Sequence, residues 1–426
     1  MHSITRPQKP WFGRPKLWLL DSFDALSRPE VIVACVEPIL RLIRGESAPE
    51  QIKLSQARRI LVVQPDLIGD VLMTTPFLRE LRQNAPEANI TLVTDKIVSN
   101  LIELCPHVDR FVAVDSNGWK LRFRWKFARN AFFLCVSNLL WQKYDLVVFP
   151  HWGTDQYYAS LICYLSGAKT RVAYSEQVCQ EKRESNKNYD KLFTHLFQGF
   201  PTTSTSHESE NYLSLISFMG GSIKNVSPEM WIDNSDRQAA VALLGKKESN
   251  RMRVAVCLGA SHARKRWPVE FYQQVMDQIG KKHAVQFVVV GSKAEMELAR
   301  QLKGDFIDCV GKTTLRECAA VMETCDVYLG NDTAPMHIAA AMGLAVVAIS
   351  CHPLDGSLVS AYSPNRFGPR TLHSSVLQPV RLQGKCAVEV QGQKFCRHAS
   401  AHCIRSVSVV DATAAVSKFL SNSKIA

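Results

Sequence analysis

Short apolar runs alternate with amphipathic stretches along most of this chain. Five runs in the first half predict buried strands: ILVVQ (60–64), ITLVT (90–94), RFVAV (110–114), DLVVF (145–149) and RVAY (171–174). Helical patterns lie between them, for example at residues 75–83 and 155–165. Continuous apolar strands separated by helices are typical of a parallel sheet whose crossover helices cover both faces.

The same alternation restarts in the second half, where five further runs predict strands: VAVCL (254–258), QFVVV (286–290), FIDCV (306–310), DVYLG (326–330) and AVVAI (345–349). Residues 180–210 are polar and predict a loop or linker, followed by a helix at about 211–219. Two α/β halves in tandem are typical of two Rossmann-like domains. We expect an extension over residues 1–57, an N-terminal domain over 58–225 and a C-terminal domain over 226–426.

Aromatic and basic residues are interleaved in two places, within the first 28 residues and in KLRFRWKFARNAFFLCVSNLLW (120–141). Such stretches can lie on an anionic bilayer surface, so a membrane-peripheral extension is one interpretation. An amphipathic helix packed on its own domain explains the pattern equally well.

Composition narrows the class of protein. The chain has 426 residues, of which 46% are hydrophobic, and a formal net charge of +12, which favours an anionic partner. No Arg/Gly-rich tract or zinc-finger spacing indicates nucleic acid. An odd count of 13 cysteines, several within apolar segments, indicates reduced thiols in the cytoplasm. Neither a signal peptide nor a run of about 18 apolar residues is evident, so no membrane-spanning helix is expected.

Two loops that follow predicted strands carry candidate charges. QPDLIGDVLMTTP (64–76) has a single glycine beside Asp70, where a dinucleotide site would require GxGxxG. Asp70 either delivers a carboxylate to a cleft or caps the next helix. GASHARKRWP (259–268) places Ser261 before three cations, Arg264, Lys265 and Arg266. These cations either neutralise a diphosphate or form a solvated turn.

Two more loops follow later strands. In GSKAEME (291–297), Glu295 either accepts the hydroxyls of a ribose or complements a helix dipole. In LGNDTAPMHIAAAMG (329–343), Asp332 and Thr333 begin a helix of small residues, whose free amides suit a phosphate. Asp332 could equally be a helix cap, and His337 could simply pack.

The late cysteines invite a metal interpretation. Three Cys and two His lie close together in sequence: Cys386, Cys396, His398, His402 and Cys403. The spacing is not a standard CxxC pair, so Cys386, Cys396 and Cys403 are a weak metal candidate, with free thiols or a local disulfide as alternatives.

The four loops, in this order and spacing, resemble glycosyltransferase family 9, the ADP-heptose:lipopolysaccharide heptosyltransferases. The resemblance runs from about Arg58 to Val416 and is carried by LIGDVLMTTPFLRELR, the K-x-W-P of KRWPVEFY, and NDTAPMHIAAAMG, with support from HESENYLSLISFMG and CIRSVSV. It implies an α/β fold of the GT-B type, with two Rossmann-like domains whose parallel sheets face an interdomain cleft. It also implies inverting transfer without a covalent intermediate.

Residue roles follow from the resemblance alone. Asp70 matches the general base and Lys265 the lysine that meets the diphosphate. The other donor-binding matches are Ser261 for a phosphate, Glu295 for the ribose, Asp332 and Thr333 near the sugar and phosphates, Ala334, where many members have Gly, and His337. On the acceptor side we expect Gly69 and the basic residues Arg122, Arg124 and Arg129 to face an anionic, lipid-linked oligosaccharide.

The leading hypothesis is therefore an enzyme that transfers heptose from an ADP-heptose donor to the lipopolysaccharide inner core. It would need no cofactor or metal, bind no nucleic acid, and work in the cytoplasm with peripheral contact to the inner membrane. A family 9 enzyme with another nucleotide sugar or a protein acceptor is the near alternative. A silent glycan-binding relative is disfavoured because Asp70 and Lys265 are both present, and an NAD-dependent oxidoreductase is disfavoured by the missing GxGxxG.

Overall fold

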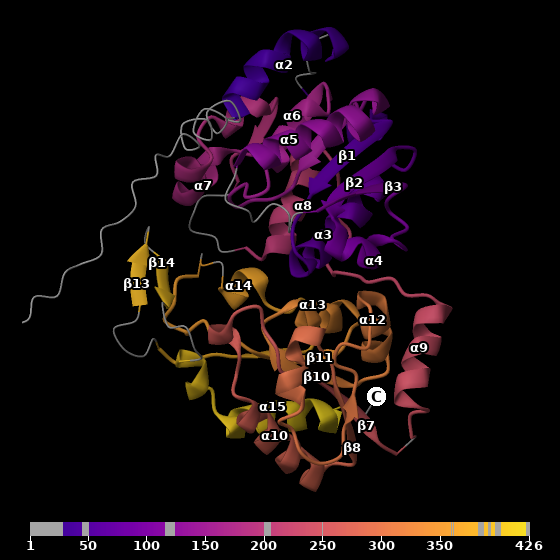
Figure 1. Cartoon of the computed structure of the whole chain (residues 1–426), viewed down its shortest axis with the longest axis vertical. Helices are drawn as coiled ribbons and strands as arrows, with labels where there is room; N and C mark the ends of the chain where they lie inside the picture. The colour runs from indigo at the N-terminus through magenta and orange to yellow at the C-terminus, as the bar shows by residue number, and fades with distance from the viewer. Residues whose placement is uncertain are drawn as a thin grey trace, which may run out of the picture.

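A computed structural model of the chain describes residues 29–44, 51–115, 124–199, 206–248, 250–358, 360, 362–381, 387–390, 393–396 and 402–422. Two lobes are stacked along the long axis, each built on a six-stranded sheet (Figure 1). The N-terminal lobe is drawn in indigo to magenta and the C-terminal lobe in orange to yellow. Within each sheet the neighbouring strands are parallel, as the sequence predicts.

The N-terminal sheet has the order β3-β2-β1-β4-β5-β6. Its strands are β1 (Arg59–Gln64), β2 (Asn89–Asp95), β3 (Arg110–Val114), β4 (Leu146–Phe149), β5 (Thr170–Tyr174) and β6 (His195–Phe197). The helices of this lobe are α2 (Pro29–Arg44), α3 (Ile68–Asn84), α4 (Ser99–Ile102), α5 (Arg124–Leu134), α6 (Ala159–Leu165), α7 (Gln180–Ser185) and α8 (Glu208–Phe218). Short turns of 3₁₀ or π type are η1 (Leu54–Gln56), η2 (Lys96–Val98), η4 (Cys135–Leu139), η5 (Leu140–Gln142), η6 (Glu176–Val178) and η7 (Tyr189–Leu192).

The C-terminal sheet has the order β12-β11-β10-β7-β8-β9. Its strands are β7 (Met252–Cys257), β8 (Val285–Val289), β9 (Ile307–Asp308), β10 (Val327–Asn331), β11 (Ala345–Ile349) and β12 (Ser374–Leu377), and β13 (Ala387–Val390) pairs with β14 (Gln393–Cys396) in a separate antiparallel hairpin. The helices are α9 (Asn234–Leu244), α10 (Val269–Lys282), α11 (Met296–Ala299), α12 (Leu315–Glu323), α13 (Ala334–Ala341), α14 (Pro364–Phe367) and α15 (Val409–Asn422). Three 3₁₀ turns are η8 (Ala263–Lys265), η9 (Lys293–Glu295) and η10 (Cys403–Ser406).

The stretch 180–210 differs from its prediction as a loop or linker. It contains α7 and the edge strand β6, and α8 already begins at Glu208. The strand escapes a periodicity analysis because it has three half-buried residues, too few to show an alternation. The chain instead crosses between the lobes after α8, where residues 219–233 contain no helix or strand. The expected domain boundary at 225/226 falls in this stretch and stays a prediction.

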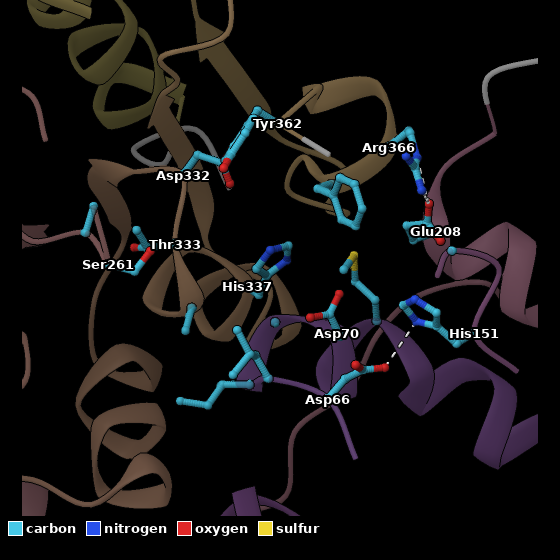
Figure 2. A pocket seen from close by; sticks show the side chains of 18 of the residues that line it. Asp66, Asp70, His151, Glu208, Ser261, Asp332, Thr333, His337, Tyr362 and Arg366 are labelled. Atoms are coloured by element: carbon cyan, nitrogen blue, oxygen red, sulfur yellow. Dashed lines mark hydrogen bonds and ion pairs between the residues drawn. The ribbon is translucent and has the colours of Figure 1, made fainter. Parts of the chain in front are cut away.

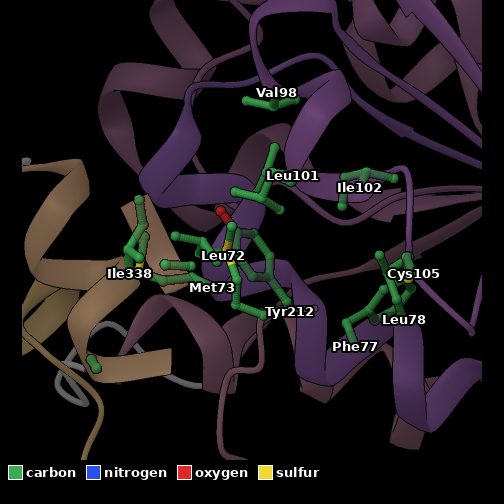
Figure 3. Packing of buried hydrophobic residues seen from close by; sticks show 14 of the residues in the cluster. Leu72, Met73, Phe77, Leu78, Val98, Leu101, Ile102, Cys105, Tyr212 and Ile338 are labelled. Carbon is green, nitrogen blue, oxygen red and sulfur yellow. The ribbon is translucent and has the colours of Figure 1, made fainter. Parts of the chain in front are cut away.

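A hydrophobic core continues from one lobe into the other. Leu72 and Met73 of α3, Tyr212 of α8 and Ile338 of α13 belong to one buried cluster (Figure 3). Burial of such side chains contributes about 1.5–3 kcal/mol each. The shared core therefore fixes the start of α13 against the start of α3, which is where the candidate chemistry lies.

Part of the predicted extension is described, namely α2 and η1. None of the described helices is long and apolar enough to cross a membrane.

Candidate active site

A cavity of about 1040 Å³ lies between the two lobes. Its N-terminal wall comes from the loops after β1 and β4, and its C-terminal wall comes from the loops after β7, β8 and β10 (Figure 2). Parallel strands deliver their carboxyl ends to one edge of a sheet, so the two sheets present their loops to a common cleft. The cavity brings together these residues singled out from the sequence: Gly69, Asp70, Ser261, Lys265, Glu295, Asp332, Thr333, Ala334 and His337.

Asp70 lies in the first turn of α3 and lines the cleft (Figure 2). It does not occupy the N-cap position of the helix, which is Leu67. Burial raises the pKa of Asp70 to about 7, with the nearby charges of Asp66 and Glu208 raising it further and that of His151 opposing. A carboxyl group that titrates near neutrality suits a general base.

Two residues on the floor of the cleft, Asp66 and His151, were not predicted as site residues from the sequence. His151 Nδ1 lies 3.1 Å from Asp66 Oδ2, and Gln64 Nε2 donates to the same carboxylate at 2.9 Å. Asp66 was quoted within the first loop without a role, and His151 stands two residues after a predicted strand. That position was the available signal, because side chains just after parallel strands face the cleft.

Lys265 and Asp332 meet on the donor wall. Lys265 Nζ lies 4.0 Å from Asp332 Oδ2 and 5.4 Å from the centre of the Tyr362 ring. Burial raises the pKa of Asp332, and the positive charges of Lys265 and His352 oppose that rise. Asp332 does not cap α13, since the N-cap residue is Thr333.

The two arginines beside Lys265 do not line the cavity, and a contact of all three cations with a diphosphate stays a prediction. Arg264 Nη2 donates to the Tyr362 hydroxyl at 2.6 Å, and Arg266 Nε donates to the Ala260 carbonyl at 2.9 Å. Of the three, Lys265 alone lines the cavity.

Asn331 holds the lysine loop in place, a role that sequence reasoning missed. Its Oδ1 accepts from the Trp267 amide at 2.9 Å, and its Nδ2 donates to the carbonyls of Leu258 at 2.9 Å and Gly259 at 3.0 Å. Trp267 is itself buried, with Nε1 donating to the Val407 carbonyl at 3.1 Å. The last residue of β10 thus ties the loop that carries Ser261 and Lys265 to the start of α13.

Glu295 takes part in the start of its helix, and its predicted contact with a ribose stays a prediction. Its carboxylate accepts from the Ser292 amide in a capping box, and it also lines the cleft. The carboxylate lies against the backbone of two glycines: a Cβ on Gly259 would be 2.1 Å from Glu295 Oε1, and one on Gly291 would be 2.6 Å from Oε2. Because glycine has no side chain, these two positions leave room for the Glu295 carboxylate.

The start of α13 forms the rest of the donor wall. Thr333 has an extended backbone and makes no side-chain cap, and its Oγ1 donates to the Asn331 carbonyl at 3.3 Å. Thr333, Ala334 and Pro335 all line the cavity, so the first turn of the helix faces the space where a phosphate would lie.

His337 packs against the other lobe. A Cβ on Gly69 would lie 2.9 Å from its Cδ2 atom, so only glycine allows this approach. Burial, together with the charges of His207 and Lys265, lowers the pKa of His337 to about 3 and keeps the ring neutral. The packing alternative for His337 therefore holds, although the ring also lines the cavity.

The acceptor-side arginines are only partly described. Arg122 lies outside the described residues, and Arg124 begins α5 without a described side chain. Arg129 is exposed on α5 and is not among the residues that line the cavity. Their predicted contact with an acceptor stays a prediction.

The late cysteines are likewise incomplete. Cys386 and the side chain of Cys396 lie outside the described part, whereas Cys403 is buried with Sγ 3.4 Å from His402 Nδ1. Among the side chains that the structure does describe, no group of three or more His, Cys, Asp or Glu is arranged to hold a metal ion. The weak metal candidate stays untested.

Comparison with known sequences gives one family. Residues 140–353 match the profile of glycosyltransferase family 9 (heptosyltransferase). The lipopolysaccharide core heptosyltransferase OpsX of Haemophilus influenzae is 21% identical over 350 residues, which cover 77% of this chain and 92% of OpsX. Lipopolysaccharide heptosyltransferase 3 of Escherichia coli is 24% identical over 292 residues, which cover 66% of this chain and 80% of that protein.

Solved structures share the fold. A family 9 glycosyl transferase of Veillonella parvula has a TM-score of 0.67 at 21% identity, covering 86% of this chain and 98% of its own. The ADP-heptose lps heptosyltransferase II of E. coli has a TM-score of 0.61 at 18% identity. The match covers 86% of this chain and 99% of that protein. These likenesses confirm the predicted GT-B arrangement of two Rossmann-like domains.

The family profile spans half of the 426 residues and includes the loops of Lys265, Glu295 and Asp332. The chain belongs to glycosyltransferase family 9 and is a glycosyltransferase.

Proposed function

We propose that this protein transfers heptose from ADP-heptose to the inner core of lipopolysaccharide, with inversion at the anomeric carbon. Relatives named as heptosyltransferases support the donor and acceptor. The observation that carries the proposal is the shared cleft, which is lined by Asp70 of one lobe and by Lys265 and the start of α13 of the other.

The reaction would be a single displacement. The acceptor hydroxyl gives its proton to the Asp70 carboxylate, and its oxygen bonds to the anomeric carbon as the bond to the diphosphate oxygen breaks. The departing ADP takes the electron pair and is stabilised by the Lys265 ammonium and the amides at the start of α13. A positioned base contributes about 10²–10⁴-fold to such a step. One displacement inverts the anomeric centre.

The remaining donor contacts follow the wall of the cleft. Glu295 would accept the ribose hydroxyls, and Ser261 and Thr333 would contact the phosphates beside Ala334. His337 would shape the floor as a neutral ring. We propose that the transfer needs no metal, because Lys265 and the helix start supply the positive field that a cation would otherwise provide.

The direct test is transfer by the purified protein. A panel of nucleotide sugars is incubated with core-truncated lipopolysaccharides, and the products are identified by mass spectrometry. A heptose mass added from ADP-heptose is expected. Transfer from another nucleotide sugar alone, or to a protein acceptor alone, would replace this proposal with the near alternative.

We also propose that the outer surface of the N-terminal lobe contacts an anionic bilayer. Apolar side chains are exposed there: Ile39 60% and Leu42 84% on α2, Phe133 61% on α5, and Trp141 70% on η5. Both segments pack on one core cluster, which contains Leu40, Cys135 and Leu139. Exposed aromatics on a protein of net charge +12 fit an acidic lipid surface.

Vesicle sedimentation tests this surface. Phe133→Ser with Trp141→Ser should weaken binding to vesicles that contain phosphatidylglycerol, while Leu372→Ser should not, although Leu372 is 96% exposed on the other lobe. Equal loss in both variants would contradict the assignment. Such a surface would place the enzyme on the cytoplasmic face of the inner membrane, and buried free thiols such as Cys163 and Cys257 fit that reducing compartment. Its anionic partners would be donor and acceptor, and not nucleic acid.

A further inference from the structure

An ion pair between His151 and Asp66 lies on the floor of the cleft, beside Asp70 (Figure 2). Asp66 and Asp70 follow β1, and His151 follows β4, which pairs with β1 in parallel. The two loops therefore leave the same edge of the sheet, and neither member of the pair has a part in the transfer described above.

The His151 ring is held from several sides. It stacks on Phe149 with ring centres 5.7 Å apart and planes inclined by 16°. Its Nδ1 atom lies 3.1 Å from Asp66 Oδ2, and a Cβ on Gly153 would lie only 2.9 Å from its Nε2. Asp66 is fixed in turn by the Gln64 amide at 2.9 Å. The ring has a defined orientation, as expected of a group that acts through its charge.

The charges that face this ring are mostly negative. Burial lowers the pKa of His151, but the carboxylates of Asp66, Asp70 and Glu208 outweigh it, so the pKa is raised overall. The neighbouring hydroxyls of Tyr157 and Tyr212 stay neutral, since burial raises the pKa of both.

From the opposite lobe, Arg366 faces the same floor, where it pairs with Glu208. His337, which packs against Gly69, stays neutral. His151 is thus the cation whose charge works against Asp66 and Glu208 at the Asp70 carboxyl.

We propose that His151, oriented by Asp66, is a positioning residue for the transfer, whose imidazolium charge favours the ionised form of the Asp70 carboxyl. The inference rests on the proposed function, because it assigns a partner to the proposed base. The proton of the acceptor hydroxyl still goes to Asp70, and His151 keeps its own proton throughout.

The test is the pH dependence of kcat/KM for heptose transfer in His151→Gln. Loss of the charge should move the acid limb of the profile upward by about one pH unit, which is the order of shift that a nearby opposite charge produces. The variant should then be about tenfold slower than the wild type at pH 6 and nearly as fast at pH 9. Damage to the fold would lower activity across the whole range and would not move the limb.

His107→Gln is the matched control. His107 forms another histidine–carboxylate pair in the same lobe, with Nε2 2.7 Å from Glu229 Oε1, and does not line the cavity. Its acid limb should coincide with that of the wild type. If His151→Gln also left the limb in place, the proposal would be overturned.

A measurement on the wild-type protein covers the case in which His151→Gln fails to fold. The ¹⁵N shifts of His151, assigned through contacts of its ring with Phe149, should report mainly an imidazolium at about pH 6.5, since its pKa is raised above the ordinary value. A neutral ring at that pH would overturn the inference even if heptose transfer is confirmed. Absence of transfer by the wild type would overturn the proposed function, and this inference with it.

Discussion

At the scale of a single residue, the ionised Asp70 carboxylate serves the proposed reaction but lowers the stability of the fold. Burial and the charges of Asp66 and Glu208 raise its pKa from 3.8 to about 7, so its ionised form is disfavoured in the folded protein. A carboxyl whose folded pKa lies above its unfolded value favours folding at low pH, and that contribution is lost as the pH rises from about 4 to about 7. The base that the reaction needs above neutrality is therefore a source of instability there.

Asp70→Asn separates the two effects. Transfer should fall by about 10²–10⁴-fold because the base is lost. The variant should gain stability over the wild type as the pH rises, with a difference near zero at pH 4 and at most roughly 4 kcal/mol above pH 7. Melting temperatures at pH 5 and pH 8 measure this. A variant that melts below the wild type at pH 8 would show that Asp70 stabilises the fold.

Because Gly259 has no side chain, it leaves room for the Glu295 carboxylate, which we propose binds the ribose. In Gly259→Ala the new methyl group would meet Glu295 Oε1 at 2.1 Å and displace the carboxylate. Loss of a charged hydrogen-bond partner should weaken ADP binding by about tenfold or more, as measured by calorimetry. Gly280→Ala is the control, because its Cβ meets only Phe287 Cε2, at an ordinary 3.9 Å. Equal ADP affinity in both variants would contradict the role of Glu295.

Sequence reasoning reached the residues that lie within recognisable motifs. Asp70, Lys265 and Glu295 were predicted, and all three line the cleft. Asp66 and His151 were not predicted, because the role of each depends on a contact between two loops that are more than 80 residues apart in sequence. Such a contact leaves no spacing signal in a single sequence.

At the scale of elements, long apolar runs predicted the inner strands well. Strands β6 and β12 were missed because they are short and mostly half-buried, which gives no clear pattern, whereas the edge strands β3 and β9 were predicted. Helix α3 begins at Ile68 and not near residue 75, since it starts directly in the loop that carries Asp70. That early start is what brings Asp70 into the cleft.

Strand β10 positions its neighbouring loop through Asn331, which is fully buried. Asn331→Ala leaves the buried Trp267 amide and two carbonyls without their partner, at a cost of roughly 2–4 kcal/mol. We expect a lower melting temperature and weaker ADP binding, because the Lys265 loop loses its anchor. Asn138→Ala, whose amide bonds only the neighbouring Ser137 hydroxyl at 2.6 Å, should change neither. Unchanged ADP affinity in Asn331→Ala would show that the loop is held by other contacts.

At the scale of the whole molecule, ion pairs join the lobes at separate places. Glu208 of α8 pairs with Arg366 of α14, and both side chains are largely buried, with 2% and 11% exposed. Glu103, just after α4, pairs with Arg316 of α12 at 2.9 Å, but its side chain is 55% exposed. A buried charge that loses its partner costs about 3–5 kcal/mol, whereas an exposed pair contributes about 0–1 kcal/mol. The Glu208–Arg366 pair should therefore stabilise the contact between the lobes more than the Glu103–Arg316 pair does.

Glu208→Gln and Glu103→Gln test that difference. Glu208→Gln removes the buried carboxylate that pairs with Arg366, whose guanidinium lies 4.7 Å from the Trp152 ring centre, so the variant should melt at a lower temperature and scatter X-rays as a more extended particle. Arg316 keeps Asp236 at 3.1 Å, so Glu103→Gln should match the wild type in both measurements. Addition of ADP should not restore compactness in Glu208→Gln, because the donor wall belongs to one lobe. Equal opening of the particle by Glu103→Gln and Glu208→Gln would show that burial does not determine how much each pair contributes. The lobes would then be held by surface charge, and high salt should weaken that attraction.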